Sequence, residues 1–344
     1  MRPAKISYPF IYLRSRDENW ELTCMGEGPK DENALKIQIG EKIIYPRKYK
    51  ISPKSQGDFA ASREYVKNLN LLHEVDSDSY ERWCFKINEI HSHLNDPQDK
   101  LEKVVLSRSK ELYYSKEIDS WLYFLHMVET YDNLPNYLFY YAPNSKESYI
   151  SCSPEKIFSM KKNISTYIEV ESMAGTISPN QDTGLNGEFT SKELEEQQIV
   201  TRSMLDCLEK FSPHTDWNLI DDIHQLKNIG HKRTKIKGLA PLGHFYNYSD
   251  LLELLTPSAS IAGYPKNLAK KLLEKLETRP RNMYAQNIGV IHDSFVEFFV
   301  GIRCCVIKDH KITLYAGCGI TKDSNPEKEW LESKLKMKSC MHSL

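Results

Sequence analysis

The sequence predicts an α+β fold, built as one large domain or two. Segments with the period-two alternation of strands and segments with helical spacing follow one another, but not in the regular strand–helix–strand order of parallel sheets. The chain has 344 residues, of which 40% are apolar, so it can bury a large core. It contains no internal repeat and no apolar run of 18 residues, which argues against a membrane-spanning helix.

The first third of the chain is predicted to contain strands, one loop and one helix. Apolar runs separated by polar turns favour strands in the first 50 residues. Apolar residues then recur at helical spacing from Tyr80 to Leu94, and Asp96-Pro97 stops the helix. We expect strands at 6–12 and 37–44, a polar loop at 52–62, a helix near 80–94 and a strand at 103–114.

The remaining two thirds of the chain alternate in the same way. Trp121, Leu125 and Val128 share a helix face, and Pro265 is placed for the first turn of a later helix. The last apolar runs, over 287–318, are interpreted as one meander of three strands with Arg303 on the middle strand. We expect helices near 121–128, 192–211 and 265–277, and strands at 137–142 and 149–152.

Charge and cysteine usage narrow the class of protein. Forty-six basic residues balance 47 acidic ones, so the composition shows no basic footprint for nucleic acid or an anionic membrane. The first twenty residues lack the apolar core of a signal peptide. The eight cysteines stand singly except for Cys304-Cys305 and form no CxxC pair, which favours reduced thiols over disulfides or zinc ligands. We therefore expect a cytoplasmic protein that binds neither nucleic acid nor membrane.

The C-terminal segment carries a glycine-rich turn followed by charged residues of both signs. Gly317 and Gly319 end an apolar run, and Glu329, Glu332 and Lys336 follow at helical i, i+3 and i+7 spacing. Two carboxylates beside a cation suit a hard divalent metal that holds an anionic ligand. The same spacing also fits an ordinary solvated helix face, so the pattern alone leaves both interpretations open.

Two further charged residues lie where a polar side chain is unusual. Lys103 begins an apolar strand, so it either extends from a sheet edge to solvent or acts as a desolvated general base. Glu155 follows Pro154 directly after a strand, where it either caps a turn in solvent or serves as a general acid with a raised pKa. Each residue therefore has a structural and a catalytic interpretation.

Taken together and in order, these segments resemble the motifs of the chorismate-utilising enzymes, a family of isochorismate, salicylate, anthranilate and aminodeoxychorismate synthases. Eight segments between about residues 80 and 340 carry the resemblance. They include Lys103-Val104-Val105-Leu106-Ser107-Arg108, Ser153-Pro154-Glu155, Ala174-Gly175-Thr176, Asn228-Ile229-Gly230-His231, Thr256-Pro257-Ser258-Ala259, Ala316-Gly317-Cys318-Gly319-Ile320 and Glu329-Trp330-Leu331-Glu332. The resemblance implies a single large domain of mainly antiparallel sheets packed face to face with helices around them. Within it, 1–80 would be a variable N-terminal part and 81–344 the catalytic region.

The resemblance also implies a role for each matching residue. Lys103 would be the general base and Glu155 the general acid. Mg²⁺ would be bound by Glu196 and Glu332, with Glu329 directly or through water. The residues that match substrate-binding positions of the family are Gly175, Thr176, His231, Tyr284, Arg303, Gly317 and Lys336. Gln197 stands where the family has a histidine, so Glu195 is a second candidate for the role of Glu196.

Two positions discriminate between members of the family. The ammonia-using members typically have lysine at the position of Ala174 and an amide at that of Lys103, so the resemblance points to water as the nucleophile. It implies a Mg²⁺-dependent isochorismate synthase acting on chorismate, in menaquinone or siderophore biosynthesis. We expect a monomer or weak homodimer. A salicylate synthase is the nearest alternative, followed by an aminating synthase component and a non-catalytic chorismate-binding protein.

Overall fold

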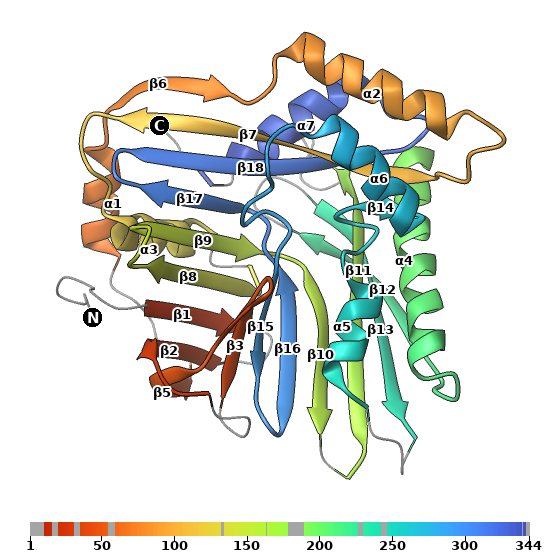
Figure 1. Ribbon diagram of the computed structural model, residues 1–344, viewed down its shortest axis with the longest axis horizontal. Helices are drawn as coiled ribbons and strands as arrows, with labels where there is room; N and C mark the ends of the chain where they lie inside the picture. Colours follow the sequence, from red (N-terminus) through yellow and green to blue (C-terminus); the bar gives the residue numbers. More distant parts are fainter. Residues whose placement is uncertain are drawn as a thin grey trace.

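Two large antiparallel sheets, packed face to face, form the centre of the molecule, and helices surround them (Figure 1). The computed structural model describes residues 10–15, 20–30, 35–53, 59–131, 134–162, 164–177, 189–225, 230–241, 246–338 and 340–341. Leu13 and Leu22 of one sheet pack with Ile37 and Phe299 of the other in one buried cluster. The prediction of a single α+β domain is therefore confirmed.

The first sheet has ten strands and brings together segments that are far apart in the sequence. Its strands are β1 (Phe10–Ser15), β2 (Trp20–Glu27), β5 (Pro46–Pro53), β6 (Leu71–Asp76), β7 (Lys103–Tyr114), β8 (Asn136–Ala142), β9 (Glu147–Ser153), β14 (Gly263–Tyr264), β17 (Cys304–Lys308) and β18 (Lys311–Ile320). Their order is β14-β7-β18-β17-β9-β8-β1-β2-β5, with β6 also paired to β7. β7 and β18 pair from Val104↔Ile320 to Tyr113↔Lys311, which places the start of β7 beside the glycine-rich end of β18.

The second sheet has eight strands in the order β12-β13-β11-β10-β16-β15-β3-β4. Their bounds are β3 (Lys36–Ile39), β4 (Lys42–Ile44), β10 (Lys156–Lys162), β11 (Thr166–Ile177), β12 (Asn218–Gln225), β13 (Gly230–Ala240), β15 (Asn287–Ile291) and β16 (Phe295–Val300). Strands of the N-terminal region contribute to both sheets, because β1 pairs with β8 and β3 pairs with β15. The sequence did not predict β10 to β13.

Within the described ranges, seven helices lie on the outer faces of the sheets (Figure 1). They are α1 (Ala60–Lys67), α2 (Tyr80–Leu94), α3 (Ser120–Thr130), α4 (Ser191–Phe211), α5 (Tyr248–Leu255), α6 (Lys266–Leu276) and α7 (Pro326–Lys338). α2 begins where the Ser79 side chain accepts a hydrogen bond from the Arg82 amide, and Thr190 forms a capping box at the start of α4. These caps satisfy amide groups that have no partner within the helix.

The helices are held by separate apolar clusters. Val200 of α4 and Leu251 of α5 pack on Phe158 and Phe298 of the eight-stranded sheet. Trp83 of α2, Leu273 of α6 and Trp330 of α7 pack together against Leu106 of β7. The second of these two clusters covers β7 and β18 of the ten-stranded sheet. As a result, α7 lies directly against the glycine-rich end of β18.

The predicted three-strand meander over 287–318 is wrong. β15 and β16 belong to the eight-stranded sheet, whereas β17 and β18 belong to the ten-stranded sheet. The chain crosses between sheets at 301–303, where Arg303 has a φ of 47°. A left-handed residue cannot continue a strand ladder, so the chain turns there. Arg303 therefore lies in the crossing between sheets and not on a strand, a distinction that apolar alternation cannot make.

Two of the early predictions need adjustment. The strand predicted at 6–12 is β1, which begins at Phe10, while residues 6–9 lie outside the described residues. The strand predicted at 37–44 is a hairpin of β3 and β4, with Gly40 at a φ of 60° in the turn. The loop predicted at 52–62 overlaps the end of β5 and the start of α1, and residues 54–58 are not described.

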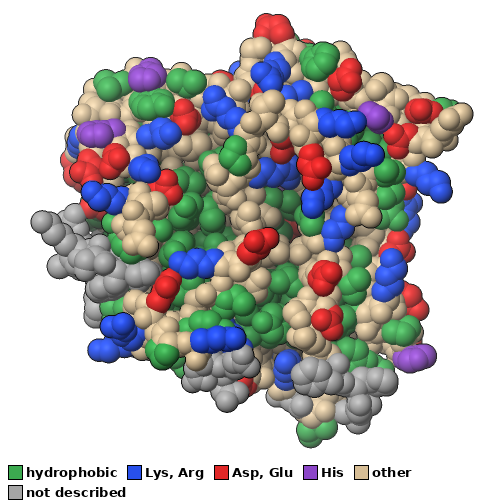
Figure 2. All heavy atoms as spheres, viewed as in Figure 1, with side chains coloured by type: hydrophobic (Ala, Val, Ile, Leu, Met, Phe, Trp, Pro, Cys, Tyr) green, Lys and Arg blue, Asp and Glu red, His purple; other side chains and the backbone are tan. Residues whose placement is uncertain are grey.

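The surface shows interspersed charges and no extended patch of one sign on the visible face (Figure 2). This agrees with the near-zero net charge of the chain. Within the described ranges, no helix has both the length and the apolar character needed to cross a membrane. All eight cysteines lie in described positions and each is a free thiol.

Candidate active site

A pocket opens between the two sheets, at the end where β11, β18 and the crossing at Arg303 come together. Nine of the twelve predicted site residues line it, namely Glu155, Gly175, Thr176, Glu196, His231, Tyr284, Arg303, Gly317 and Lys336. Met173, Ala174, Ser260, Ile261 and Tyr315 complete much of the wall. The other three, Lys103, Glu329 and Glu332, lie next to Glu196 and Lys336. The structure therefore brings all twelve residues into one region.

The glycines of β18 allow other side chains to approach the strand closely. A Cβ atom on Gly317 would lie 2.2 Å from the Tyr284 hydroxyl oxygen. A Cβ atom on Gly319 would lie 2.1 Å from Glu196 Oε1 and 2.7 Å from Lys103 Cε. Any larger residue at these two positions would push the tyrosine or the charged pair away from the strand.

Gly175 forms a bulge in β11. The register with β13 shifts between Ala174 and Thr176, and Gly175 has a φ of 69°. A Cβ atom at Gly175 would lie 2.7 Å from the backbone oxygen of Glu193 in α4. The bulge directs Thr176 toward His231, whose Nδ1 lies 3.2 Å from the Thr176 Oγ1.

His231 is neutral and its tautomer follows from its neighbours. Arg303 Nη2 lies 3.1 Å from His231 Nε2, and a guanidinium can only donate, so Nε2 accepts and Nδ1 carries the hydrogen. Burial and the positive charge of Arg303 hold the pKa of His231 well below its usual value. Nδ1 then donates to Thr176, which leaves the threonine hydroxyl hydrogen for a ligand. Arg303 Nη1 is buried without a hydrogen-bond partner among the described residues, so this group is also available.

Glu155 is a buried carboxyl group with the properties of an acid. Its side chain accepts a hydrogen bond from Ser260 Oγ at 2.5 Å, and Ser258 Oγ lies 2.6 Å from Ser260 Oγ. Burial raises the pKa of Glu155 to about 7, with a further contribution from the charge of Glu171, against the opposing effects of Ser260 and Lys103. Near neutral pH a substantial share of Glu155 is therefore protonated.

Lys103 lies beside Glu196 at the base of the pocket. Its Nζ is 3.0 Å from Glu196 Oε1, and the lysine is completely buried. This contact is an ion pair without hydrogen-bond geometry, and Nζ makes no hydrogen bond within the described part of the chain. Burial opposes ionisation of Glu196, but the charges of Lys103 and Lys192 outweigh it and lower the pKa of the carboxyl.

Lys103 belongs to a cluster of three ammonium groups and three carboxylates. Its members are Lys103, Lys192, Lys336, Glu196, Glu329 and Glu332. Lys192 Nζ lies 2.8 Å from Glu329 Oε1 and 3.9 Å from Glu196 Oε2, and Lys336 Nζ lies 2.6 Å from Glu332 Oε1. Burial and the charge of Glu332 raise the pKa of Glu329 to about 7. Glu329 Oε2 is buried and makes no hydrogen bond to any described residue.

This cluster fits a hard divalent cation. Mg²⁺ prefers carboxylate oxygens, and Glu329 Oε2 is a buried oxygen with no hydrogen-bond partner among the described residues. The like-charge repulsion between Glu329 and Glu332 would be relieved by a cation between them. Glu195, the second candidate for the position of Glu196, is 37% exposed and pairs with Lys322. Its side chain therefore lies apart from the cluster.

Two residues of the site were missed from the sequence. Lys192 lies four residues before Glu196 in α4, so its i, i+4 spacing was a usable signal. Ser260, which donates to Glu155, follows the Thr256-Pro257-Ser258-Ala259 segment by one residue, but its spacing gave no indication of this contact. Gln197, which stands where the resembling family has histidine, is buried and its Nε2 lies 3.1 Å from both Ser172 O and Thr234 Oγ1.

Comparison with known proteins shows the family of the chain. The model of a family described as "Chorismate binding enzyme" matches residues 11–344. The chain belongs to the chorismate binding enzyme family. Among curated relatives of this chorismate binding enzyme, isochorismate synthase MenF of Haemophilus influenzae is 28% identical over 96% of the chain and 85% of the relative. Other curated relatives are covered over about half of their length, such as 54% for MenF of Escherichia coli.

Solved structures share the fold of this chorismate binding enzyme. DhbC of Bacillus anthracis superposes with a TM-score of 0.81 at 18% identity, covering 97% of this chain and 95% of the other. MenF of Escherichia coli, a menaquinone-specific isochorismate synthase, gives a TM-score of 0.80 at 20% identity, with 98% and 90% covered. The two-sheet arrangement described above is therefore the fold of these relatives.

Proposed function

We propose that the protein is an isochorismate synthase, an enzyme that converts chorismate to isochorismate. The observation that carries this proposal is the presence at one pocket of Glu155, a buried carboxyl whose pKa is raised to about 7, and Lys103, a buried lysine. These are the acid and the base that the exchange of a ring hydroxyl group requires. The relatives from Haemophilus influenzae and Escherichia coli that carry this name support the assignment.

In the proposed reaction, the neutral amine form of Lys103, present after its ammonium has lost a proton to solvent, takes a proton from a water molecule, whose oxygen attacks carbon 2 of the ring. The ring double bonds shift, and Glu155 donates its proton to the hydroxyl group that leaves carbon 4 as water. One water enters and one leaves, so substrate and product have equal mass. Return of a proton from Lys103 to Glu155 restores both groups.

Substrate binding is assigned to the groups on the opposite wall of the pocket. Arg303, held by His231, presents Nη1, which has no hydrogen-bond partner in the described part of the chain, and Tyr284 presents its hydroxyl group beside Gly317. A guanidinium fork suits a carboxylate, so we assign Arg303 and Tyr284 to the enolpyruvyl carboxylate. Lys336, which donates to the Gly317 carbonyl at 3.0 Å, adds positive charge to this wall.

Glu196, Glu329 and Glu332 would hold Mg²⁺ next to the ring carboxylate. The cation would supply charge neutralisation and orientation of that carboxylate. The glutamates themselves provide the negative charge that keeps Lys103, Lys192 and Lys336 at the pocket base.

Water, and not ammonia, is the proposed nucleophile. Ala174 lines the pocket with a methyl group, at the position where the ammonia-using members of the family carry a lysine. Lys103 stands where those members carry an amide. Both differences favour a water molecule beside a basic amine.

The proposal is tested with purified protein, chorismate and Mg²⁺, with and without ammonium, followed by chromatography and mass determination. We expect a new species of the same mass as chorismate, whose formation stops with EDTA. Salicylate with pyruvate would assign a synthase that also eliminates pyruvate. An aminated product would contradict the role of Ala174 and Lys103, and binding without turnover would overturn the enzyme assignment.

A further inference from the structure

Cys318 brings a thiol to the carboxylate cluster. It lies on β18 and its side chain points away from the pocket, to the face that α7 covers with Trp330. Its Sγ and one oxygen from each of Glu329 and Glu332 lie within 4.8 Å of one another. The cluster therefore contains a soft donor beside two hard ones.

These donors are buried and incompletely used. Cys318 is fully buried, and its thiol donates a hydrogen bond to the backbone oxygen of Glu329 at 3.3 Å, while its sulfur lone pairs stay available to a metal. Glu329 is 2% exposed, with Oε1 held by Lys192 and Oε2 without a hydrogen bond to any residue in the described ranges. A buried carboxylate oxygen without a partner is costly unless a ligand satisfies it.

The donor set has the composition of a site for a borderline or soft cation. Mg²⁺ prefers oxygen ligands over sulfur, whereas Zn²⁺ binds thiolate and carboxylate together in tetrahedral sites. In a tetrahedral zinc site with bonds of about 2.0–2.3 Å, neighbouring ligand atoms lie roughly 3.5 Å apart. The distances between Cys318 Sγ and the two carboxylate oxygens would therefore have to shorten by little more than about 1 Å. Side-chain rotation of Glu329 and Glu332 on α7 can supply such a movement.

We propose that Cys318, Glu329 and Glu332 form a binding site for a thiophilic divalent cation such as Zn²⁺, with the cysteine thiolate as the third protein ligand. The proposal rests on the proposed function, because it shares two carboxylates with the assigned Mg²⁺ site. As the sulfur–zinc bond forms, the thiol proton leaves to solvent, and no electron is transferred. Zinc at this site takes both carboxylates from Mg²⁺, so zinc competes with magnesium.

The proposal is tested by zinc X-ray absorption spectroscopy on the full chain, treated with a chelator and then given one equivalent of Zn²⁺. We expect one sulfur at about 2.3 Å in the zinc shell, together with oxygen ligands. Cys318→Ser removes the sulfur and weakens Zn²⁺ binding at least about tenfold in competition calorimetry, while Mg²⁺ affinity changes less than about twofold. A zinc shell that lacks sulfur, or equal zinc affinity in Cys318→Ser, overturns the proposal.

Two further variants separate this inference from the proposed function. Cys84→Ser removes a half-buried thiol on α2, and the sulfur signal is expected to remain. Glu329→Gln removes a shared ligand and is expected to weaken both cations. If neither cation responds to Glu329→Gln, the metal site of the proposed function fails. If both cations respond but the zinc shell of the unsubstituted protein contains no sulfur, only the role of Cys318 is overturned. Cys318→Ala serves in the same experiment if the serine variant does not fold.

Discussion

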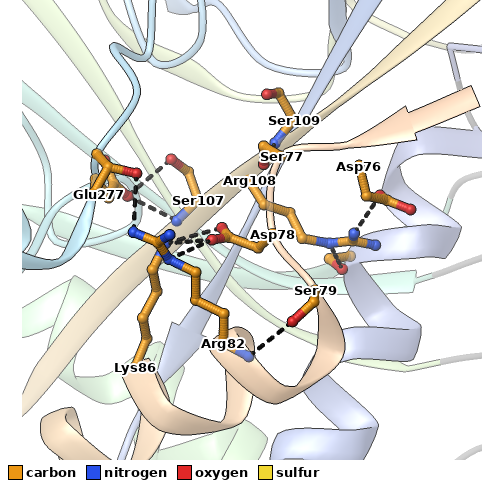
Figure 3. A network of polar contacts seen from close by, with 12 residues as sticks. Asp76, Ser77, Asp78, Ser79, Arg82, Lys86, Ser107, Arg108, Ser109 and Glu277 are labelled. Atoms are coloured by element: carbon orange, nitrogen blue, oxygen red, sulfur yellow. Dashed lines mark hydrogen bonds and ion pairs between the residues drawn. The ribbon is translucent and has the colours of Figure 1, made fainter.

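Two clusters of charged residues lie beside β7, at Ser107 and at Lys103, and they differ in how completely their polar atoms are satisfied. At Ser107, Glu277 Oε1 accepts hydrogen bonds from both the amide and the hydroxyl group at 2.8 Å, and Lys86 donates to both oxygens of Asp78 at 2.9 Å. Figure 3 shows these pairs pointing toward each other. Four residues earlier on the strand, Lys103 contacts Glu196 without a hydrogen bond.

This difference in hydrogen bonding indicates which buried charged groups stabilise the fold and which are placed to bind a ligand. In the Ser107 network, Arg281 also donates to both oxygens of Glu277, at 2.7 Å and 2.8 Å, so this carboxylate is fully used. In the pocket cluster, Lys103 Nζ and Glu329 Oε2 have no hydrogen bond among the residues described. Buried polar atoms are almost always satisfied, so unsatisfied atoms in a pocket indicate ligand positions.

The largest expected effect is on catalysis at the pocket end of β7. Lys103→Ala and Glu155→Gln should each lower kcat by about 10²–10⁴-fold or more, because each removes a proton-transfer group. Chorismate affinity, measured by calorimetry, should persist in both variants. Lys100→Ala, at an exposed lysine just before β7, is the matched control with wild-type rates. Near-normal turnover in either active-site variant would contradict the assignment.

The satisfied network should respond through stability instead. Lys86→Met leaves the buried Asp78 without its main partner and should lower the free energy of unfolding by about 3–5 kcal/mol. The pocket is untouched, so kcat of the folded fraction should stay near wild type. Urea unfolding measures the first quantity and steady-state kinetics the second. The double variant Lys86→Met with Asp78→Leu should recover part of the lost free energy of unfolding. If it recovers none, Lys86 does not stabilise the fold through Asp78.

A smaller catalytic effect is expected at Gly319. Gly319→Ala places a methyl group where Glu196 Oε1 and Lys103 Cε now lie, at 2.1 Å and 2.7 Å from the new Cβ. Displacement of both groups by about 1 Å should lower kcat about 10²-fold. Mg²⁺ affinity should fall in the same variant, because Glu196 is one of the assigned ligands. Gly28→Ala is the control for catalysis, because its new Cβ meets the backbone of Arg47 and Tyr45, from 3.2 Å outward, and no residue of the pocket.

The contrast between the clusters also explains what could be predicted from the sequence. Residues in one short segment, such as Ala316 to Ile320, could be matched as motifs because their order along the chain is visible. Contacts between segments could not, since the Ser260 bond to Glu155 joins residues 105 apart in the chain. Arg303 was wrongly placed on a strand, because the alternation of apolar and polar residues predicts a strand but does not show which sheet the strand joins. Cys318 looked like an isolated thiol until α7 placed two carboxylates beside it.

The smallest expected effect concerns the pH dependence of the pocket. Glu155 must be protonated to act as an acid, so kcat should fall as pH rises through about 7. Glu171 contributes a negative charge that raises the pKa of Glu155, while Lys103 and Lys336 lower it. Glu171→Gln should therefore shift this alkaline limb of the kcat profile to lower pH, by less than about one unit.

The two limbs of the profile make this prediction specific. Glu329 also has a pKa raised to about 7, but it must be ionised to bind a cation, so it affects the acidic side at limiting Mg²⁺. At saturating Mg²⁺, Glu171→Gln should move only the alkaline limb. Glu169→Gln, two residues earlier on the same face of β11 and paired with Lys156 and Lys237, is the matched control and should leave the limb in place. A limb that moves equally in both variants would assign the titration to the general charge of β11 and not to the Glu155–Glu171 pair.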